Sequence, residues 1–377
     1  MAAPQQGGRQ PGEAPTDERL AGPRLGPLHQ VHEALGATMT DFGGWLMPLD
    51  YGSVLAEHRA VRDQVGVFDV SHLGRVIVRG DGADATVSKV LTNDVTMLAP
   101  GRGHYTLCLD EDGGIIDDLL VYRLAGHYSD GLLVVPNASN APAVIERLRA
   151  AAAADTEVRD IQDELACLAV QGPGATMVLE SVDIPVEHYA YLDSRDMAGH
   201  GVIARTGYTG ERGYEIFPRT EDVATLWERL VAAGAKPAGL GARDTLRLEM
   251  GYPLHGNDIG VDTNPVEAGL LWAVKGTGFT GHEAVAAAKA AGPRRRLRGV
   301  RIVGRGIPRA HCTVLHDGKP VGELTSGTIS PTLNAGVGMG YLDASVAVGD
   351  QVEVDVRGKL LPAEVVTPPF VDRNPRS

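Results

Sequence analysis

The last part of the chain contains only short strand-like runs. An Arg-rich strand begins near Arg295, and four further runs follow it: VGELTSG, VGMGYLD, DQVEVDVRG and LLPAEVV. Their spacing of about 8–12 residues is typical of sandwiches and barrels. Such strands bury their apolar side chains by packing one sheet face against another or by closing the sheet on itself. The sequence therefore predicts a β-rich C-terminal domain.

The preceding residues mix helical and strand-like patterns. Val54–Gln64 and Ala141–Ala154 have the apolar spacing of helices, and Gly66–Gly80 alternates apolar and polar residues as a strand does. Two more strand-like runs are joined by an Asp-Gly-Gly turn at Asp112–Gly114, a strong hairpin signal. With short connections between these elements, the pattern predicts an α+β fold.

Length and charge narrow the class of protein. A chain of 377 residues suggests two or three domains, and its net charge of −13 disfavours nucleic-acid or anionic-membrane partners. The three cysteines, Cys108, Cys167 and Cys312, are too few and too scattered for a disulfide framework or a paired-Cys metal site. No run approaches the roughly 18 apolar residues of a membrane span. We therefore expect a protein of the reducing cytoplasm.

Residues 1–27 are rich in Pro, Gly and polar side chains. They contain no apolar core of the kind a secretion signal needs. Acidic residues are present and Ser is absent, which argues against a transit peptide. We expect this segment to be a flexible leader.

Familiar catalytic motifs are absent from the sequence. It contains no Walker A loop, HExxH or GxSxG. One GxGxxG pattern occurs at Gly276–Gly281, but an Arg-rich run stands where a ribose-binding acid is expected. We interpret this pattern as the turn that begins a helix.

Two polar pairs stand beside turns. Ser71 and His72 are adjacent in a strand-like run, so their side chains point to opposite faces, and a structural role for His72 is favoured. Asp117 and Asp118 alternate in the same way. We interpret them as a solvated pair near a turn rather than as a cation site or an acid–base pair.

Three other positions are stronger candidates. Asp94 closes a helix within the apolar run LTNDVTML, where it either faces a pocket or is an ordinary turn residue. Glu215 lies between apolar neighbours in a strand, and an inward carboxylate needs a partner. Arg243 and Arg247 share one helical face, where they form either internal salt bridges or an anion clamp.

Several ordered runs resemble the aminomethyltransferases, the T-proteins of the glycine cleavage system. The resemblance covers about Leu28 to Phe370 and rests on DFGGWLMPLDYGS, VFDVSHLG, LTNDV, GGIIDDLLVYR, NASN, VQGP, RTGYTGERGYEI, ARDTLRLEMGYPLHGND and TSG followed by SPTL. It implies three domains around a central folate opening. Residues 28–55 and 141–275 would form a discontinuous folate-binding domain, 56–140 an α+β domain, and 276–377 a linker helix with a jelly-roll-like barrel.

The resemblance also implies a reaction. The one-carbon unit of an aminomethyl group, carried on the lipoyl arm of the H-protein, passes to tetrahydrofolate. The products are 5,10-methylenetetrahydrofolate, ammonia and dihydrolipoyl H-protein, and no metal is implied.

The family's functional residues carry over to four positions. Asp94 corresponds to the catalytic Asp that orients folate N10, and Glu215 and Arg243 correspond to folate-binding residues, the latter suited to the anionic glutamate tail. Tyr105 is a weaker candidate for the pocket. Some members place a folate-contacting Tyr near the C-terminus, but the comparable stretch here, Phe370–Pro375, has no aromatic hydroxyl. That contact is dispensable or replaced.

Two alternatives share the same fold. One is a folate-dependent demethylase of a small methylated donor, which would use the same pterin pocket. The other is a non-enzymatic folate-binding factor for iron–sulfur assembly, marked by a KGCYxGQE-type motif. The corresponding stretch, Lys275–Glu283, has no Cys, which favours an enzyme.

Residues 294–309 form a basic stretch in an otherwise acidic chain. Arg295 and Arg296 within it could steer an acidic carrier protein by long-range attraction. A solvated strand with its flanking linker is the alternative interpretation.

Overall fold

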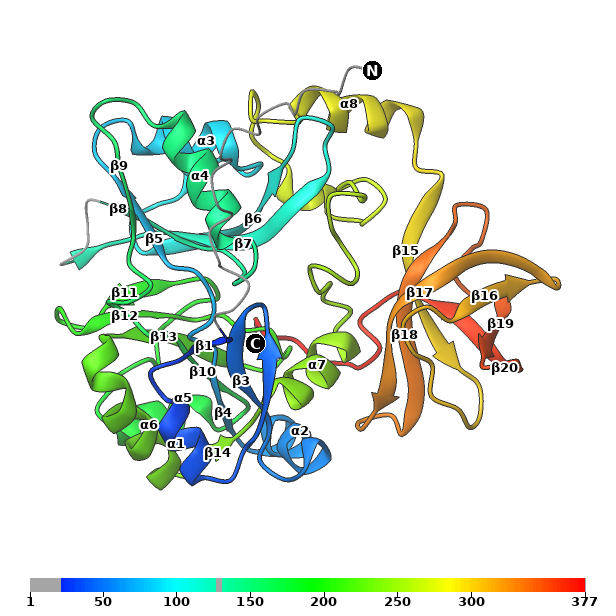
Figure 1. Cartoon of the computed structure of the whole chain (residues 1–377), viewed down its shortest axis with the longest axis horizontal. Coiled ribbons are helices and arrows are strands. Elements are labelled where there is room, and N and C mark those ends of the chain that lie inside the picture. Colours follow the sequence, from blue (N-terminus) through cyan, green and yellow to red (C-terminus); the bar gives the residue numbers. More distant parts are fainter. Residues whose placement is uncertain (1–21, 127–130, 377) are drawn as a thin grey trace, which may run out of the picture.

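The computed structural model describes residues 22–126 and 131–376. Within them the strands form three open sheets and one closed barrel. Figure 1 shows two sheets stacked with their helices on one side of the molecule and the barrel on the other. The α+β prediction and the β-rich C-terminal domain are both confirmed.

The six-stranded sheet has the order β11-β12-β13-β10-β4-β14. Helices α1 (His29–Ala34), α5 (Ala175–Ser181) and α6 (Val223–Ala232) belong to this part of the chain. Its strands are β4 (Gly66–Asp69), β10 (Leu168–Gln171), β11 (Ser194–Asp196), β12 (Gly201–Ala204), β13 (Gly213–Pro218) and β14 (Lys236–Pro237). Because successive strand residues point to opposite faces, Val67 packs with α5 and α6 while Phe68 packs toward the second sheet.

The five-stranded sheet has the order β6-β7-β8-β5-β9. Helices α3 (Ala83–Val90) and α4 (Ala141–Ala151) cover its outer face, where their apolar side chains form one core. The strands are β5 (Val76–Arg79), β6 (Arg102–Leu109), β7 (Ile115–Arg123), β8 (Gly131–Val135) and β9 (Glu157–Asp160). The predicted hairpin is present, because β6 pairs with β7 across Asp112–Gly114 and Gly113 adopts a left-handed φ of 84°. Only a residue without Cβ adopts that conformation freely.

A small three-stranded sheet precedes helix α2 (Val54–Asp63). Its strands are β1 (Arg24–Leu25), β2 (Thr38–Phe42) and β3 (Trp45–Asp50). Arg24 and Leu25 pair with β3, so the last residues of the predicted leader are ordered. The rest of that leader, residues 1–21, lies outside the described residues.

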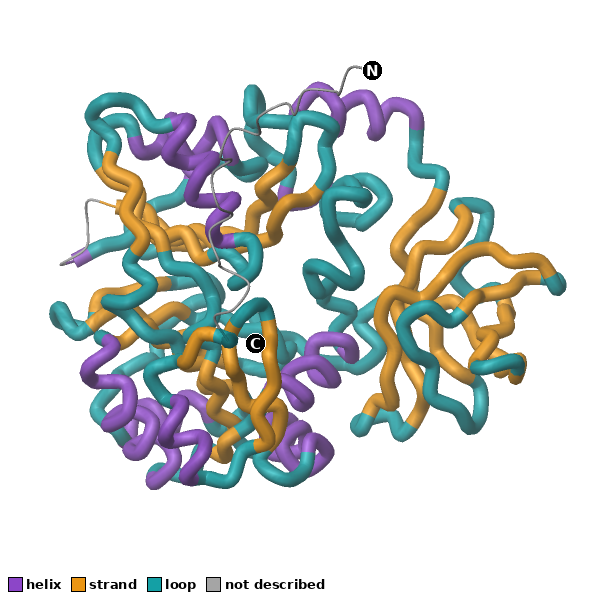
Figure 2. Tube along the Cα trace, viewed as in Figure 1, coloured by secondary structure: helices purple, strands orange, loops and turns teal. Residues whose placement is uncertain are grey.

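Helix α7 (Leu240–Glu249) leads into a segment that is mostly loop (Figure 2). This segment contains the short helix η4 (Leu271–Ala273) and ends at α8 (His282–Ala291). Two further short 3-10 helices are η1 (Val95–Met97) and η3 (Thr220–Asp222). Phe279 and Val285 pack against Leu107 and Ile115 of the β6–β7 hairpin, so the segment belongs with the five-stranded sheet.

The barrel closes in the order β15-β18-β17-β16-β19-β20. Its strands are β15 (Arg295–Ile302), β16 (Thr313–His316), β17 (Lys319–Ser330), β18 (Ala335–Asp343), β19 (Gln351–Val356) and β20 (Lys359–Val366). Inward residues such as Val300, Leu324 and Val354 are fully buried in its core. Closure leaves the sheet without an unpaired edge.

Strand pairing divides the chain differently from the predicted domain boundaries. Strand β4 lies within 56–140 but pairs with β10 in the six-stranded sheet, and α4 and β9 lie within 141–275 but belong to the five-stranded sheet. Residues distant in sequence pair here, which local patterns do not reveal. We propose that β1–β4 and β10–β14 form one domain, β5–β9 with the segment through α8 a second, and β15–β20 the third.

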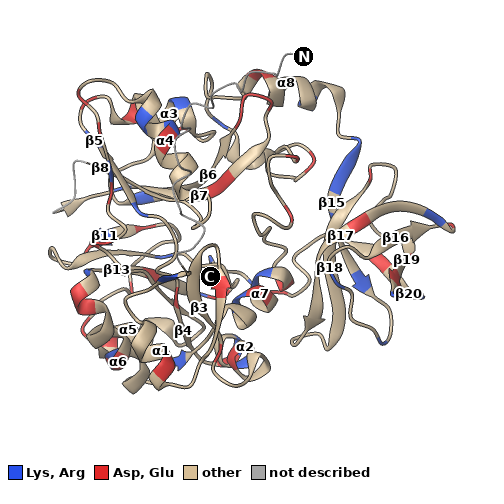
Figure 3. Ribbon diagram, in the orientation of Figure 1, with Lys and Arg blue, Asp and Glu red and all other residues tan. Residues whose placement is uncertain are grey.

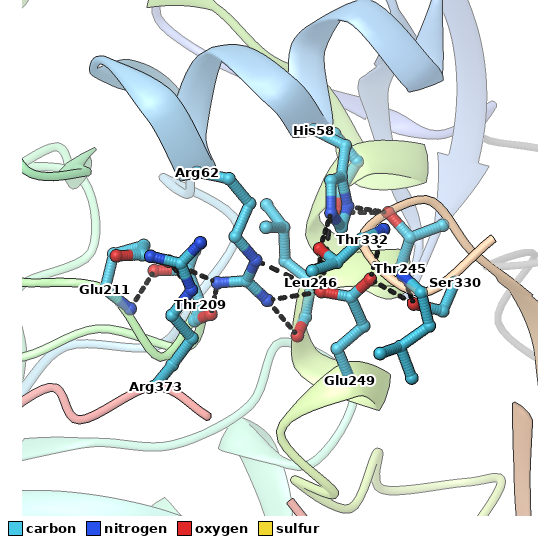
Figure 4. A network of polar contacts seen from close by, with 12 residues as sticks. His58, Arg62, Thr209, Glu211, Thr245, Leu246, Glu249, Ser330, Thr332 and Arg373 are labelled. Carbon is cyan, nitrogen blue, oxygen red and sulfur yellow. Dashed lines mark hydrogen bonds and ion pairs between the residues drawn. The ribbon is translucent and has the colours of Figure 1, made fainter. Parts of the chain in front are cut away.

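A buried carboxylate joins the barrel to the six-stranded part. Glu249, at the end of α7, is fully buried and accepts hydrogen bonds from Arg62 Nη2 at 2.8 Å, Ser330 Oγ at 2.5 Å and the Thr332 backbone N–H at 3.0 Å. His58 of α2 lies 3.4 Å away (Figure 4). Burial raises the pKa of Glu249, but His58, together with Ser330 and Arg62, outweighs this effect and holds the pKa at about 2.

Replacing Glu249 by Gln should destabilise the protein by about 3–5 kcal/mol, because Arg62 would keep a buried charge without this partner. The measurement is the free energy of unfolding in urea. The matched control is Glu364→Gln in the barrel, whose pair with Arg301 is half-exposed and whose loss should cost less than about 1 kcal/mol. Equal effects of the two substitutions would contradict the role given to Glu249.

Candidate functional site

Strand β7 places two adjacent carboxylates on opposite faces of the five-stranded sheet. Asp117 shares its face with Leu119, which packs against α3 and α4. Asp118 shares the other face with Leu120, which packs toward the six-stranded sheet. The two side chains therefore stand on either side of one strand, as strand alternation requires.

Asp118 is held by two donors. Tyr105 Oη donates to its Oδ2 at 2.9 Å, and Asn137 Nδ2 donates to its Oδ1 at 3.1 Å. Burial raises the pKa of the Asp118 carboxyl, while these hydrogen bonds and the charge of His255 oppose the rise. Asp118 is thus a fixed carboxylate at the face between the two sheets.

Asp117 is fully buried, so the interpretation of a solvated pair was wrong. Its carboxylate accepts hydrogen bonds from the Asn137 backbone N–H at 3.0 Å, Asn137 Nδ2 at 2.8 Å and Asn140 Nδ2 at 2.7 Å. Burial and the neighbouring charge of Asp118 raise the pKa of Asp117 to about 8. Alternation predicted the two faces correctly, but it could not show that α4 and its preceding loop cover one of them.

Aromatic rings surround Asp118. Tyr105 stacks on Trp272 with ring centroids 5.0 Å apart, and Trp272 is 57% exposed. Tyr208 stacks on Tyr252 at 5.7 Å. Burial raises the pKa of Tyr208, and the negative charge of Asp118 adds to the rise. Tyr208 therefore lies within electrostatic reach of Asp118.

Arg243 lies against Tyr208, and Glu215 is within electrostatic reach of Arg243. The Arg243 guanidinium carbon is 4.7 Å from the centroid of the Tyr208 ring. Glu215, on β13, is 4% exposed, and burial raises its pKa while the charge of Arg243 opposes the rise. Within the described residues no group donates a hydrogen bond to this carboxylate, and Arg243 Nη1 is buried without a hydrogen-bond partner. Buried polar groups are normally paired, so this pair has the properties of a ligand site.

Tyr105, Glu215 and Arg243 thus belong to one site. They are three of the four residues carried over from the resemblance. We use the term central cluster for Tyr105, Asp118, Tyr208, Glu215 and Arg243. It joins the five-stranded sheet, the six-stranded sheet and α7. Tyr105, the weaker candidate, is bonded directly to a carboxylate of the cluster.

Asp94 lies outside the central cluster. It precedes η1, where its Oδ1 accepts hydrogen bonds from the Thr96 N–H at 3.0 Å and Thr96 Oγ1 at 2.6 Å. Its charge acts on His104, whose pKa burial lowers to about 4. Because His104 and Tyr105 are consecutive on β6, their side chains point to opposite faces. The hydrogen bonds to Thr96 fix Oδ1 of Asp94 at the turn, and its catalytic role stays a prediction.

His72 is buried in the turn after β4, and the ring of Phe42 meets it edge-on at 5.5 Å. Burial, with the positive charge of Arg243, lowers the pKa of His72 to about 3. His72 is therefore neutral beside the cluster. The Ser71 hydroxyl is not placed to act as a nucleophile, because it donates a hydrogen bond to the Cys167 carbonyl at 3.2 Å.

The GxGxxG pattern at Gly276–Gly281 precedes α8, as the interpretation of a helix-starting turn requires. Gly281 has a φ of 82°, and a Cβ there would lie 2.4 Å from the Asp110 carbonyl oxygen. The glycine allows α8 to pack on the β6–β7 turn. This is a packing role.

The two predicted carrier-contact residues differ in surroundings. Arg295 Nε donates to Glu267 at 2.9 Å, and its guanidinium lies 4.5 Å from the Tyr341 ring centroid. Arg296 is exposed on β15, the strand that Figure 3 shows in blue. Only Arg296 of the two presents its charge to solvent without such a partner.

A cleft of about 790 Å³ lies between the β2–β3 hairpin and α4. Trp45, Ser139 and Arg149 line it, and it contains none of the central cluster. Arg24 at its rim is already paired with Asp163 and stacked on Trp45. Among the described residues, the lining of this cleft includes none of the buried side-chain atoms that lack a hydrogen-bond partner, whereas Arg243 Nη1 of the central cluster is one of them.

Among the described residues no group of three or more His, Cys, Asp or Glu side chains is arranged to hold a metal ion. In the same part of the chain, no helix has the length and hydropathy of a membrane span.

Comparisons with known proteins agree with this architecture. A family model described as the GCVT N-terminal domain matches residues 28–277, and one described as the glycine cleavage T-protein C-terminal barrel domain matches 295–372. An aminomethyltransferase of Frankia alni is 50% identical over 370 residues, which cover 95% of this chain and 100% of that protein. One from Mycobacterium tuberculosis strain H37Rv is 47% identical over 357 residues, covering 92% of this chain and 96% of the relative.

A solved structure is also similar. The crystal structure of the glycine cleavage system aminomethyltransferase T from Bartonella henselae superposes with a TM-score of 0.88 at 35% identity, covering 93% of this chain and 99% of that chain. The fold is thus that of a glycine cleavage aminomethyltransferase. The chain belongs to the aminomethyltransferase family, the glycine cleavage T-proteins, and is a transferase enzyme.

Sequence reasoning assigned no chemistry to Asp118, Asn137 and Tyr208. The runs GGIIDDLLVYR, NASN and RTGYTGERGYEI contain them. A signal was available, because an adjacent Asp pair on a hairpin strand always has one member facing the other sheet. What covers each face depends on tertiary packing.

The burial of Glu215 predicts a pH dependence of stability. Because its pKa is raised above the ordinary 4.5 in the folded state, the native protein binds a proton more tightly than the unfolded chain, so stability falls as pH rises through that range. In wild type the free energy of unfolding should fall by up to about 1.4 kcal/mol per pH unit over this range, and Glu215→Gln should remove this fall. Thermal unfolding from pH 4 to pH 8 measures it. Glu228→Gln, at an exposed position on α6, is the control, and identical profiles for wild type and Glu215→Gln would contradict the assignment.

Proposed function

We propose that this protein transfers the one-carbon unit of an aminomethyl group from the lipoyl arm of an H-protein to tetrahydrofolate. The products would be 5,10-methylenetetrahydrofolate, ammonia and dihydrolipoyl H-protein. The observation that carries the proposal is the pair of unsatisfied buried groups, the Glu215 carboxylate and Arg243 Nη1, beside the fixed carboxylate of Asp118. Family membership supplies the reaction class.

Glu215 and Arg243 would bind the pterin ring. The ring presents adjacent N–H donors that a carboxylate can accept in a bidentate manner, and its carbonyl oxygen can accept from a guanidinium. Because Arg243 acts on Glu215 and stacks on Tyr208, we propose that both residues bind this end of the folate. The sequence assigned Arg243 to the glutamate tail instead. A buried pair with opposite charges suits a neutral polar ring better than a second carboxylate.

Asp118 would act on the reacting nitrogens. A carboxylate within hydrogen-bond reach of the folate N10 can orient it and accept a proton as the nitrogen attacks the aminomethyl carbon. Tyr105 and Asn137 fix that carboxylate. The carbon–nitrogen bond to the amine and the carbon–sulfur bond to the lipoyl arm break as the two new bonds to folate N5 and N10 form. The protons lost from these nitrogens leave with ammonia and with the thiol of the dihydrolipoyl arm. Asp94, to which the resemblance gives the role of orienting N10, stays the first candidate for that role, and we propose Asp118 as a second carboxylate at the reacting nitrogens.

Two isosteric substitutions separate these assignments. Asp118→Asn should lower turnover by about 10²–10⁴-fold, because general acid–base and orienting groups contribute this much. Asp94→Asn should also lower turnover, because its predicted role is to orient N10. The assay mixes purified protein with aminomethylated H-protein and tetrahydrofolate and measures ammonia and methylenetetrahydrofolate, with circular dichroism as a check on folding. A severe loss of turnover in Asp94→Asn but not in Asp118→Asn would contradict the role proposed for Asp118. A wild-type protein that binds folate but does not turn over would point to a different methylated donor.

The exposed end of β15 would attract the carrier. Arg296→Glu should weaken the apparent affinity for H-protein at low salt, and the difference from wild type should vanish as salt screens the interaction. Arg59→Glu, an equal charge change at an exposed position on α2, is the control. An unchanged affinity of Arg296→Glu at low salt would contradict this role. Arg295 is unsuitable for the test, because its substitution would also break the pair with Glu267.

A further inference from the structure

His72, in the turn after β4, has a buried side-chain nitrogen without a partner. The residue is 2% exposed, and its backbone carbonyl accepts a hydrogen bond from Gln162 Nε2 at 3.1 Å. Within the described residues its Nδ1 atom has no such contact, and the Phe42 ring that meets the imidazole edge-on offers no polar atom to it. Because buried polar atoms are normally paired, Nδ1 has the property of a ligand contact.

Two of the three charged groups that act on His72 already have partners. Asp69, at the end of β4, pairs with His32 Nε2 at 2.9 Å and accepts from the Ser71 N–H at 2.8 Å. The Arg75 guanidinium donates to three backbone carbonyl oxygens around the same turn. The third group is the Arg243 guanidinium, whose Nη1 is buried and unpaired. Unpaired atoms of His72 and Arg243 thus occur together.

Arg243 lies between His72 and Glu215. Glu215 on β13 is paired with Ala169 on β10, which is paired with Phe68 on β4, so the three side chains share one face of the sheet. Neighbouring strands are about 4.8 Å apart, so β13 and β4 are about 10 Å apart. Helix α7 packs on this face. Among the described residues Arg243 is the one charged group that acts on both His72 and Glu215.

The imidazole of His72 can accept a hydrogen bond. Burial and the charge of Arg243 lower the pKa of His72 to about 3, and the charge of Asp69 opposes this effect only in part. A neutral imidazole has one N–H and one acceptor nitrogen. Since no acceptor in the described part of the chain is bonded to Nδ1, the hydrogen can stay on Nε2. Nδ1 is then the acceptor.

We propose that His72 Nδ1 accepts a hydrogen bond from N5–H of the tetrahydropterin ring. The inference rests on the proposed function and deepens it, because it concerns the ring that Glu215 and Arg243 would bind. Around that ring the carbonyl group stands between N3–H and N5–H. With Glu215 at the N3–H side and Arg243 at the carbonyl, the residue beyond Arg243 meets N5. By holding the N5 hydrogen, His72 directs the lone pair that bonds to the one-carbon unit.

A purely structural role is the competing explanation for His72. Its ring would then only fill the space beside Phe42, and its loss would affect stability alone or the binding of every folate equally. Folic acid separates the two explanations, because its oxidised ring has a lone pair and no hydrogen on N5. An acceptor at Nδ1 faces that lone pair unfavourably, so His72 favours the reduced ring over the oxidised one.

The experiment compares the dissociation constants of tetrahydrofolate and folic acid, measured by calorimetry on the full chain without oxygen. His72→Leu should weaken tetrahydrofolate binding about 3- to 10-fold, the contribution of one hydrogen bond, without weakening the binding of folic acid. His29→Leu is the matched control, since His29 Nδ1 is also buried and unpaired but lies on α1, which packs in a different core. It should change neither constant. An unchanged preference in His72→Leu, or equal losses for both ligands, would overturn the proposal.

Two polar variants keep the test decisive if His72→Leu does not fold. Asn places a polar atom near the position of Nδ1, and Gln places one near Nε2. His72→Asn should therefore keep most of the preference for tetrahydrofolate, and His72→Gln should lose it. The same preference in both variants would overturn the proposal. A wild-type protein that binds neither folate would instead contradict the proposed function, which separates the two failures.

Discussion

The buried charges of helix α7 connect the parts of this molecule. Glu249 is fully buried and holds Arg62 of α2 together with Ser330 and Thr332 of the barrel. Two residues earlier, Arg247 is paired with Asp258 at 2.6 Å and donates to Ser326 of the barrel at 2.8 Å. Because a buried charge without a partner is very costly, the barrel and the six-stranded sheet have little freedom to separate. The same helix carries Arg243 into the central cluster, so the position of the barrel and the geometry of the site depend on one element.

The site contrasts with this satisfied network. Glu249 and Arg247 have their hydrogen bonds within the protein, whereas Glu215 and Arg243 Nη1 are buried and lack them. Polar groups left unsatisfied in a native structure are expected where a ligand completes them. Asp118 differs from both groups. Two donors hold its carboxylate, and its side chain lies on the face of β7 that is directed toward the six-stranded sheet. The cluster therefore combines an incomplete binding pair with a preorganised carboxylate.

Local patterns predicted the elements of the fold well and their partners poorly. The hairpin turn at Asp112–Gly114 and the strands of the barrel follow from residue types that act over a few positions. The pairing of β4 with β10 joins residues about a hundred positions apart, and no local pattern encodes it. For the site, alternation placed Glu215 inward correctly, but the same rule gave Asp117 and Asp118 no chemistry, because burial depends on α4 and on the second sheet. Asp94 was chosen from its apolar context and from the resemblance; it lies at a turn, and its catalytic role stays a prediction.

The central claim is that folate binds between Glu215, Arg243 and Asp118. A crystal structure with bound tetrahydrofolate tests it most directly. The account predicts pterin N–H groups within hydrogen-bond distance of the Glu215 carboxylate, Arg243 beside the same ring, and the N10 side of the folate near Asp118. A pterin bound instead in the cleft lined by Trp45 and Arg149 would contradict it.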